Sequence, residues 1–351
     1  MKILLNEKLF LLPGSLRAGT LGSLILASLL LGPGLTDQAT AEEWKPPASP
    51  ESLQPSLELP DLFTFADGSK VKTKADWERR REEMKKMLLY YQYGRIPPRP
   101  DSVSATGIER RPHPSGKGSM ELMTLLIDSK KKLRMRILLN LPKSPGRRPV
   151  ILCEAGRLGR NQNVPMFLDK GYIFIEYARS DLDPDRKDFA GPAQQAYPGY
   201  DWATLSVWAW GAMRLVDYLE TRDDIDLERI ATTGHSRGGK MALLTAALDE
   251  RFAMAIPNQS GAGGSGCYRI LGPGAETLGM NDKPWWYHER IQWFGEREEY
   301  LPFDQHFLKA LVAPRAVISN EAFEDLFANP LGTQVSSMAA QEAFRFLGVP
   351  E

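Results

Sequence analysis

Short apolar runs recur along the chain from residue 150 onward, and segments long enough for a helix separate most of them. Runs of this kind are typical of strands buried on both faces of a parallel sheet. Ahead of them, apolar and arginine residues alternate from Leu133 to Ile137, which predicts one strand of a hairpin. The predicted hairpin strands are 121–127 and 133–139, and the predicted buried strands are 150–153, 172–177, 230–233, 252–256 and 316–319.

Apolar residues at helical spacing predict the helices around these strands. The stripe from Trp77 to Tyr91 predicts an amphipathic helix that ends before Pro97 and packs across the main sheet. Further stripes predict a strong helix over 205–219 and another over 335–346. A hairpin that leads into a parallel β-α-β series gives a doubly wound α/β fold, a three-layer sandwich with a mostly parallel sheet.

The N-terminal region has a different pattern. Basic residues precede a mainly apolar run over 21–31, which is shorter than the about 20 residues needed to span a bilayer. Small residues suited to signal peptidase follow, so residues 1–41 are predicted to be a signal peptide and the mature protein to be secreted or periplasmic. A buried or anchoring helix is the alternative. Residues 42–59, rich in Pro and Ser, are predicted to be a flexible linker before one domain over 60–351.

Composition limits the classes of partner. Lys and Arg together number 44, and so do Asp and Glu, so no net charge would draw the chain to nucleic acid or, after signal cleavage, to an anionic membrane. Two cysteines, Cys153 and Cys267, allow one disulfide without requiring it. The sequence has no His/Cys/Asp cluster with the spacing of a metal site, so neither a metal nor a cofactor is expected. The oligomeric state stays open.

The segment 234–238 reads Gly-His-Ser-Arg-Gly between a predicted strand and a helix that begins near Lys240. It matches the G-x-S-x-G elbow, in which the serine occupies a strained turn and the glycines avoid collisions with the neighbouring strand and helix. The hydroxyl of Ser236 would then stand free as a nucleophile, and the backbone N–H of Arg237 would stabilise an oxyanion. The alternative is a serine that only caps the helix.

Three motifs in order, GHSRGGK, IPNQSGAGG and LPFDQHFLKALVAPR, make residues 60–350 resemble the glucuronoyl esterases, a family of α/β-hydrolases. The resemblance implies an exported serine esterase that cleaves esters between glucuronic acid on xylan and lignin alcohols. It implies that Ser236 is the nucleophile, that Arg237 stabilises the oxyanion through its N–H and guanidinium, and that Lys240 contacts sugar hydroxyls. Glu276 resembles the family's sugar-binding glutamate, although the spacing differs, and a surface-loop glutamate is the alternative.

Three positions depart from the family pattern. Gln259 stands where fungal relatives have the triad acid, and an amide cannot stabilise an imidazolium by charge, so Gln259 is a candidate substrate contact instead. Many bacterial relatives place the acid in a D-L-W-A-D-P segment, which here begins at Asp325. Asp325 is therefore the candidate catalytic acid, with a loop cap as the alternative. Phe327 replaces the tryptophan that offers a face for sugar stacking.

The base of the triad is also missing. α/β-Hydrolases order the triad as serine, acid and histidine, but residues 326–351 contain no histidine. His306 is the leading substitute, although it is expected to be structural, and His235 should face away from the hydroxyl. The resemblance therefore implies a chain truncated at its C-terminus, with the last strand and helix missing and 316–319 left as an exposed edge.

Two other functions stay open. The elbow chemistry does not tell which side of the ester is recognised, so an acetylxylan-type esterase is one alternative. A non-catalytic carbohydrate-binding remnant is the other, because losing a triad member removes about 10⁴ to 10⁶ of the rate and leaves roughly 10³ from binding and the oxyanion hole. The partner expected for the leading interpretation is glucuronoxylan or another uronic acid ester.

Overall fold

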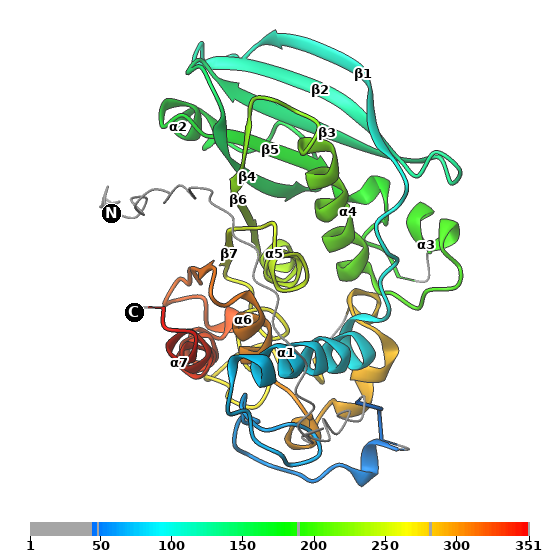
Figure 1. The fold of residues 1–351 in the computed structure, drawn as a ribbon, viewed down its shortest axis with the longest axis vertical. Helices are drawn as coiled ribbons and strands as arrows, with labels where there is room; N and C mark the ends of the chain where they lie inside the picture. The colour runs from blue at the N-terminus through cyan, green and yellow to red at the C-terminus, as the bar shows by residue number, and fades with distance from the viewer. Residues whose placement is uncertain (1–43, 48, 188–189, 281–282, 350–351) are drawn as a thin grey trace, which may run out of the picture. The chain divides into compact units, whose positions relative to one another are not determined.

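An eight-stranded sheet in the order β1-β2-β3-β5-β4-β6-β7-β8 organises the protein in the computed structural model, which describes residues 44–47, 49–187, 190–280 and 283–349 (Figure 1). The strands are β1 (Val103–Pro112), β2 (Gly118–Ile127), β3 (Leu133–Pro142), β4 (Arg148–Ala155), β5 (Ile173–Ala178), β6 (Ile225–His235), β7 (Met254–Asn258) and β8 (Ala316–Val317). The helices are α1 (Lys74–Leu88), α2 (Val164–Asp169), α3 (Pro192–Ala196), α4 (Thr204–Leu219), α5 (Arg237–Leu248), α6 (His306–Val312) and α7 (Pro330–Phe346).

The sheet changes direction once. Strands β1 to β3 form an antiparallel meander, and β3 pairs antiparallel with β5. From β5 through β4, β6 and β7 to β8 every pairing is parallel. The predicted α/β class and mostly parallel sheet are confirmed, and each predicted strand coincides with an observed one. The apolar pattern missed β1, because this edge strand is exposed over most of its length.

Alternating residues of the central strands face two different helical layers. Ile151 on β4 and Phe174 on β5 pack with Val164 and Leu168 of α2 in a small core. Their neighbours in the strands, such as Leu152, belong instead to the large core on the other face. Because successive side chains of a strand point to opposite faces, this division gives the three layers predicted.

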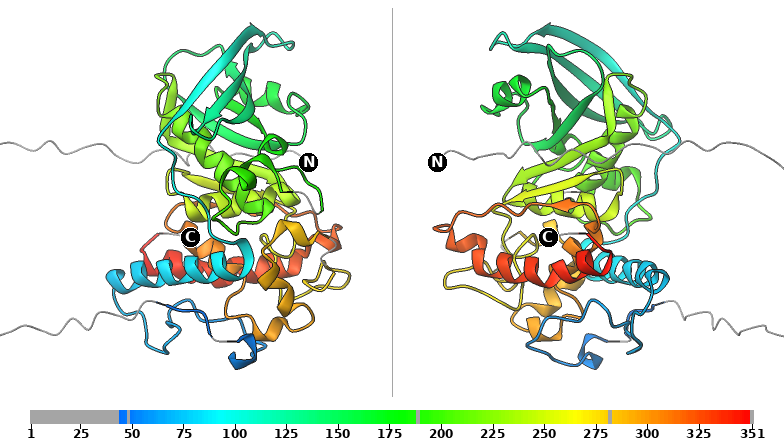
Figure 2. Two further views of the ribbon diagram at one scale, coloured as in Figure 1. Left: turned by 90° about the vertical axis from the view of Figure 1, so that its right-hand side faces the viewer. Right: turned by 60° about the vertical axis from the view of Figure 1, so that its left-hand side comes forward.

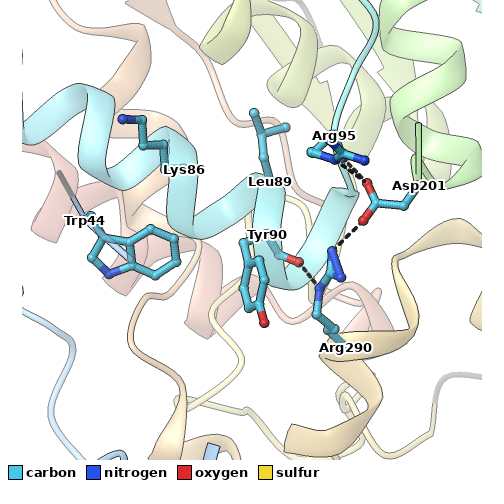
Figure 3. Close-up of a pocket in the computed structure, with 7 residues that line it drawn as sticks. All are labelled: Trp44, Lys86, Leu89, Tyr90, Arg95, Asp201 and Arg290. Atoms are coloured by element: carbon cyan, nitrogen blue, oxygen red, sulfur yellow. Dashed lines mark hydrogen bonds and ion pairs between the residues drawn. The ribbon is translucent and has the colours of Figure 1, made fainter. Parts of the chain in front are cut away.

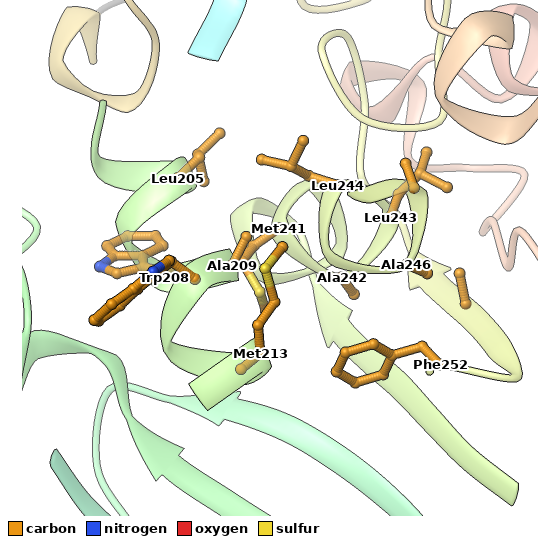
Figure 4. Packing of buried hydrophobic residues seen from close by; sticks show 14 of the residues in the cluster. Leu205, Trp208, Ala209, Met213, Met241, Ala242, Leu243, Leu244, Ala246 and Phe252 are labelled. Carbon is orange, nitrogen blue, oxygen red and sulfur yellow. The ribbon is translucent and has the colours of Figure 1, made fainter. Parts of the chain in front are cut away.

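The large core is built around α4 and α5. Every residue of α4 is buried, which explains why its sequence is apolar on nearly all sides. Figure 4 shows Trp208 and Met213 of α4 close to Met241 of α5, with Phe252 at the base of the next strand. This packing fixes the N-terminus of α5, where the predicted nucleophile lies.

The first helix differs from the prediction in its neighbours. α1 packs on α6 rather than across the sheet, and it lies beside α7 (Figure 2). The rings of Trp77 in α1 and Phe346 in α7 lie 6.1 Å apart. The apolar positions therefore predicted the helix correctly, but they do not indicate which part of the protein the helix packs against. The last helical turns continue as a π-helix, η2 (Leu89–Tyr93).

The ends of the predicted domain can be described only in part. Residues 1–41, predicted as a signal peptide, lie outside the described residues. Within the predicted linker 42–59, the Ser56 N–H donates to the Glu299 carbonyl at 2.8 Å, and Arg269 Nε donates to the Ser56 carbonyl at 3.0 Å. Among the described helices, none is long and apolar enough to cross a membrane. Cys153 and Cys267 are both free, so the optional disulfide is not formed.

Candidate functional site

The strained turn predicted at the serine is present between β6 and α5. Ser236 has φ 55° and ψ −121°, a conformation that costs a side-chain-bearing residue energy and persists only where the surroundings impose it. A Cβ on Gly234 would lie 2.4 Å from the backbone of Gly238, and one on Gly238 would lie 2.0 Å from Glu154 Oε1. Gly234 is therefore required sterically, as the motif predicts, whereas a side chain at Gly238 would displace the carboxylate of Glu154.

The elbow leaves the serine accessible. Ser236 is half-buried, and its hydroxyl has no hydrogen-bond partner in the part of the chain that the structure describes. Its backbone is held on both sides, because Ser236 N–H donates to the Asn258 carbonyl at 2.9 Å and Lys240 N–H donates to the Ser236 carbonyl at 3.0 Å. The hydroxyl is thus free to meet a ligand above the first turn of α5, and the N–H of Arg237 lies at that helix N-terminus.

Arg237 is held by an anchor that the sequence did not reveal. Its guanidinium pairs with Asp185 and lies over the ring of Trp286, 5.1 Å from the centroid. The other oxygen of Asp185 accepts hydrogen bonds from Trp285 Nε1 at 3.0 Å and Trp286 Nε1 at 2.7 Å. Burial raises the pKa of Asp185, but these donors outweigh burial and hold the pKa below its ordinary value. The Asp185 carboxylate, which both indole N–H groups hold in place, therefore fixes the arginine beside the serine.

Lys240 and Glu276 meet, although 36 residues separate them. Lys240 is 2% exposed, and its ammonium donates to Glu276 Oε2 at 2.7 Å and to the Ala262 carbonyl. Burial lowers the pKa of Lys240, while Glu276 and Glu321 oppose that shift. The contact gives this loop glutamate a specific partner on α5, and the pair places hydrogen-bond donors and acceptors beside that helix.

Gln259 and Asp325 also come together. Gln259 has φ 45°, and its Nε2 donates to Asp325 Oδ2 at 2.9 Å. Asp325 also accepts from the Ala328 N–H at 3.3 Å and caps the short 3-10 helix η7 (Leu326–Ala328). Asp325 thus has the partners of the loop cap that was kept as the alternative. Phe327 is 59% exposed, and its carbonyl accepts from Glu276 N–H at 3.0 Å.

None of the four histidines is hydrogen-bonded to Ser236 in the described residues. His306 is 1% exposed and its Nε2 lies 2.8 Å from the Pro60 carbonyl. His288 Nδ1 accepts from the Arg290 N–H at 3.1 Å, and its Nε2 faces Asp201 at 3.4 Å. The predicted structural character of His306 agrees with its burial.

The remaining two histidines are His113, which is half-buried, and His235, which is exposed. His113 Nδ1 is 2.7 Å from Ser115 Oγ in the turn between β1 and β2. His235 ends β6, directly before the elbow. In the described residues, neither Ser236 nor Asp325 is therefore hydrogen-bonded to a histidine.

A second buried ionic cluster lies between α6 and α7. Lys309 donates to the Thr333 carbonyl at 3.1 Å and to two serine hydroxyls of α7, and burial lowers its pKa to about 7. Burial raises the pKa of the neighbouring Glu321 to about 7. The sequence assigned no role to either residue: Lys309 lies within the motif LPFDQHFLKALVAPR, but its burial and partners appear only in the fold. Among the described residues, no group of three His, Cys, Asp or Glu side chains is arranged to hold a metal ion.

Known proteins resemble the chain over the same elements. The profile of a family described as "Glucuronyl esterase, fungi" matches residues 126–348. A 4-O-methyl-glucuronoyl methylesterase from Schizophyllum commune is 30% identical, with 93% of this chain and 82% of that protein covered. One from Cerrena unicolor is 29% identical, and the match covers 84% of this chain but only 63% of that protein's length.

Solved structures give the same assignment. A carbohydrate esterase family 15 glucuronoyl esterase from Caldicellulosiruptor kristjansonii has a TM-score of 0.73 and 31% identity, with 83% of this chain and 82% of that chain covered. The glucuronoyl esterase from Sporotrichum thermophile has a TM-score of 0.70 and 28% identity, and the match covers 84% of this chain and 79% of that chain. It was solved as a serine-to-alanine mutant in complex with methyl 4-O-methyl-β-D-glucopyranuronate. The chain belongs to the glucuronyl esterase family.

Proposed function

We propose that the protein is a carboxylic ester hydrolase for glucuronic acid esters of xylan, with Ser236 as its nucleophile. The hydroxyl oxygen attacks the ester carbonyl carbon, and the Arg237 N–H and guanidinium stabilise the oxyanion that forms. The alcohol leaves with a proton, and water then hydrolyses the glucuronoyl-serine ester. Lys240 and Glu276 contact sugar hydroxyls, with Gln259 and Phe327 as further contacts.

The observation that carries this proposal is the accessible, positive-φ serine beside a fixed arginine. Such a turn is costly for a serine, so its presence favours a role for the hydroxyl over a helix cap. The ion pair of Lys240 and Glu276 supports sugar recognition, because both residues are nearly buried and keep polar atoms near the same helix. The relatives named as 4-O-methyl-glucuronoyl methylesterases support the choice of substrate.

The absence of a histidine beside Ser236 sets the expected rate. A hydroxyl without a positioned base must transfer its proton to water, which costs about 10⁴ to 10⁶ of the rate of a complete triad. We therefore expect slow, Ser236-dependent turnover by these 351 residues, with substrate affinity largely retained. Asp325 lacks an imidazole to stabilise, so it should contribute little.

Hydrolysis of benzyl glucuronate, compared with acetylated xylose, tests the function. We expect slow release of benzyl alcohol that is lost in Ser236→Ala and kept in Ser129→Ala, a change of an exposed turn serine. Lys240→Met should weaken cleavage of the glucuronate ester much more than cleavage of the acetyl ester. Faster Ser236-dependent cleavage of acetylated xylose would instead favour an acetylxylan-type esterase.

A non-catalytic carbohydrate-binding protein is the second candidate, because no described histidine contacts Ser236. In that case a glucuronoxylan fragment binds without turnover, and Ser236→Ala changes neither binding nor product formation. Product release that disappears with Ser236 excludes this candidate. The two candidates therefore give opposite results in one assay. A secreted or periplasmic location is part of the same proposal, since the substrate is a cell-wall polymer.

A further inference from the structure

A pocket outside the elbow has no role in the proposed reaction. Its volume is about 430 Å³, within the roughly 300–1,000 Å³ typical of small-molecule sites. It lies between the C-terminal end of α1, the loop before α4 and the 3-10 helix η5 (Glu289–Phe294) (Figure 3). None of the residues assigned to ester cleavage lines it. These segments are distant in the sequence, so only the fold creates the pocket.

One wall of the pocket is aromatic and apolar. It is formed by Leu89 and Tyr90, in the π-helical turn η2, and by Trp44. The rings of Trp44 and Tyr90 meet edge to face, with centroids 5.9 Å apart. Single π-turns inside helices are frequent at functional sites, because they turn side chains out of the regular helical positions. The wall offers ring surfaces to a ligand with a flat or C–H-rich face.

Next to Tyr90, the pocket carries an excess of positive charge. Asp201 accepts from Arg290 Nη2 at 2.7 Å and from the backbone N–H of Arg95 at 2.8 Å, and Arg95 Nε lies 3.5 Å from the same carboxylate. One carboxylate therefore faces two guanidinium groups, and His288 approaches it as well. Figure 3 shows both arginines converging on Asp201, with Arg290 beside the Tyr90 ring.

The two guanidinium groups keep donors for a ligand. Arg290 uses Nε and Nη2 for the Tyr90 carbonyl and Asp201, and its guanidinium lies 4.3 Å from the Tyr90 ring centroid. Arg95 uses Nη2 for the Gly199 carbonyl. In the described part of the chain, Nη1 of each arginine has no hydrogen-bond partner. Guanidinium N–H pairs are the preferred partners of carboxylates, and Asp201 holds both arginines in place.

We propose that this pocket is a second carbohydrate site, which binds a sugar ring that carries a free carboxylate, a uronic acid residue. The C–H face of the ring packs on Trp44 and Tyr90, and the carboxylate binds Arg95 and Arg290. The negative charge of the ligand is inferred from the arginines of the pocket alone, whereas the choice of a sugar ring rests on the proposed function. A second contact along a glucuronoxylan chain would raise the local concentration of ester groups at Ser236.

Calorimetric titration of the full chain with methyl glucuronoside tests the proposal, with methyl glucoside and benzoate as the matched probes. We expect a Kd of about 1 mM for the glucuronoside, weaker by about tenfold in Trp44→Ala and in Arg95→Gln. Arg95 is 69% exposed, whereas Trp44 is half-buried, and melting temperatures should confirm that both variants fold. Ser236→Ala should bind like the unchanged chain.

Each other outcome overturns the proposal. Absence of binding excludes the site, and binding that is lost only in Lys240→Met places the sugar at the elbow instead. If methyl glucoside binds equally well, the arginines do not recognise a carboxylate. If benzoate binds more tightly than the glucuronoside, the pocket is a site for an aromatic acid and not for a sugar. Hydrolysis of a soluble small ester should be unchanged in Trp44→Ala. Failure of the second site is therefore distinguishable from failure of the esterase proposal.

Discussion

The buried His306 should make the protein less stable in acid, by an amount that the structure allows us to state. Burial lowers the pKa of His306 from its ordinary 6.5 to about 4. Between pH 6.5 and pH 4 the imidazole is therefore protonated in the unfolded chain but neutral in the folded protein. The free energy of unfolding falls as the pH falls through this range. At pH 4.5 the loss amounts to about 2.5 kcal/mol relative to pH 8.

The variant His306→Gln isolates this contribution. Its amide can still donate to the Pro60 carbonyl but cannot be protonated, so we expect a cost of about 1 kcal/mol at pH 8 from imperfect replacement of the bond. At pH 4.5 the variant should instead be the more stable protein, by about 1.5 kcal/mol. Urea unfolding of both proteins at the two pH values, followed by fluorescence, measures the reversal.

The comparison must be made between the two proteins at the same pH. Burial raises the pKa of Asp183 and of Glu321 to about 7, and those carboxyls stabilise the folded state as pH falls from 7 toward 4. Their contribution is common to both proteins and cancels in the difference. A stability difference that stays constant from pH 8 to pH 4.5 would refute the reasoning, because it would mean that His306 is freely protonated in the folded state. Any Ser236-dependent hydrolysis should be unchanged in the variant, and its loss would identify His306 as the base.

Two further substitutions test the elbow and its anchor. Gly234→Ala should abolish hydrolysis and cost about 3 kcal/mol, because its Cβ would lie 2.4 Å from the backbone of Gly238, which cannot move aside. Gly199→Ala, with open space around it, should change stability by less than about 0.5 kcal/mol, and thermal and urea unfolding measure both changes. Asp185→Asn removes the charge that holds Arg237 and should lower kcat about tenfold with little change in KM. Asp185→Glu should recover part of the loss. An unchanged kcat in Asp185→Asn would show that Arg237 needs no anchor.

The sequence identified those features that depend on contiguous residues. The elbow could be predicted because a strand, a turn and a helix follow one another within a few residues, and because Gly234 avoids a collision with the backbone of Gly238 inside the same turn. The parallel strands could be predicted because strands buried on both faces are continuously apolar. β1 was missed for the same reason, since an exposed edge strand has no apolar run.

Contacts between distant residues could not be predicted in this way. Asp185 and Arg237 are separated by 52 residues, and Gln259 and Asp325 by 66, so no local pattern pairs them. The resemblance to a family singled out Lys240 and Glu276 one at a time, but their ion pair appears only when the loop after β7 folds back over α5.

The sequence by itself determined the fold class and the position of the strained turn at Ser236, because both depend on local spacing that the backbone imposes, and its three motifs pointed to the family by resemblance. The tertiary structure alone decided which charges are paired and which histidines are buried, because burial and pairing depend on the surfaces that packing brings together. The pocket beside Trp44 is a further example, since its aromatic wall and its arginines come from segments that meet only in the folded chain.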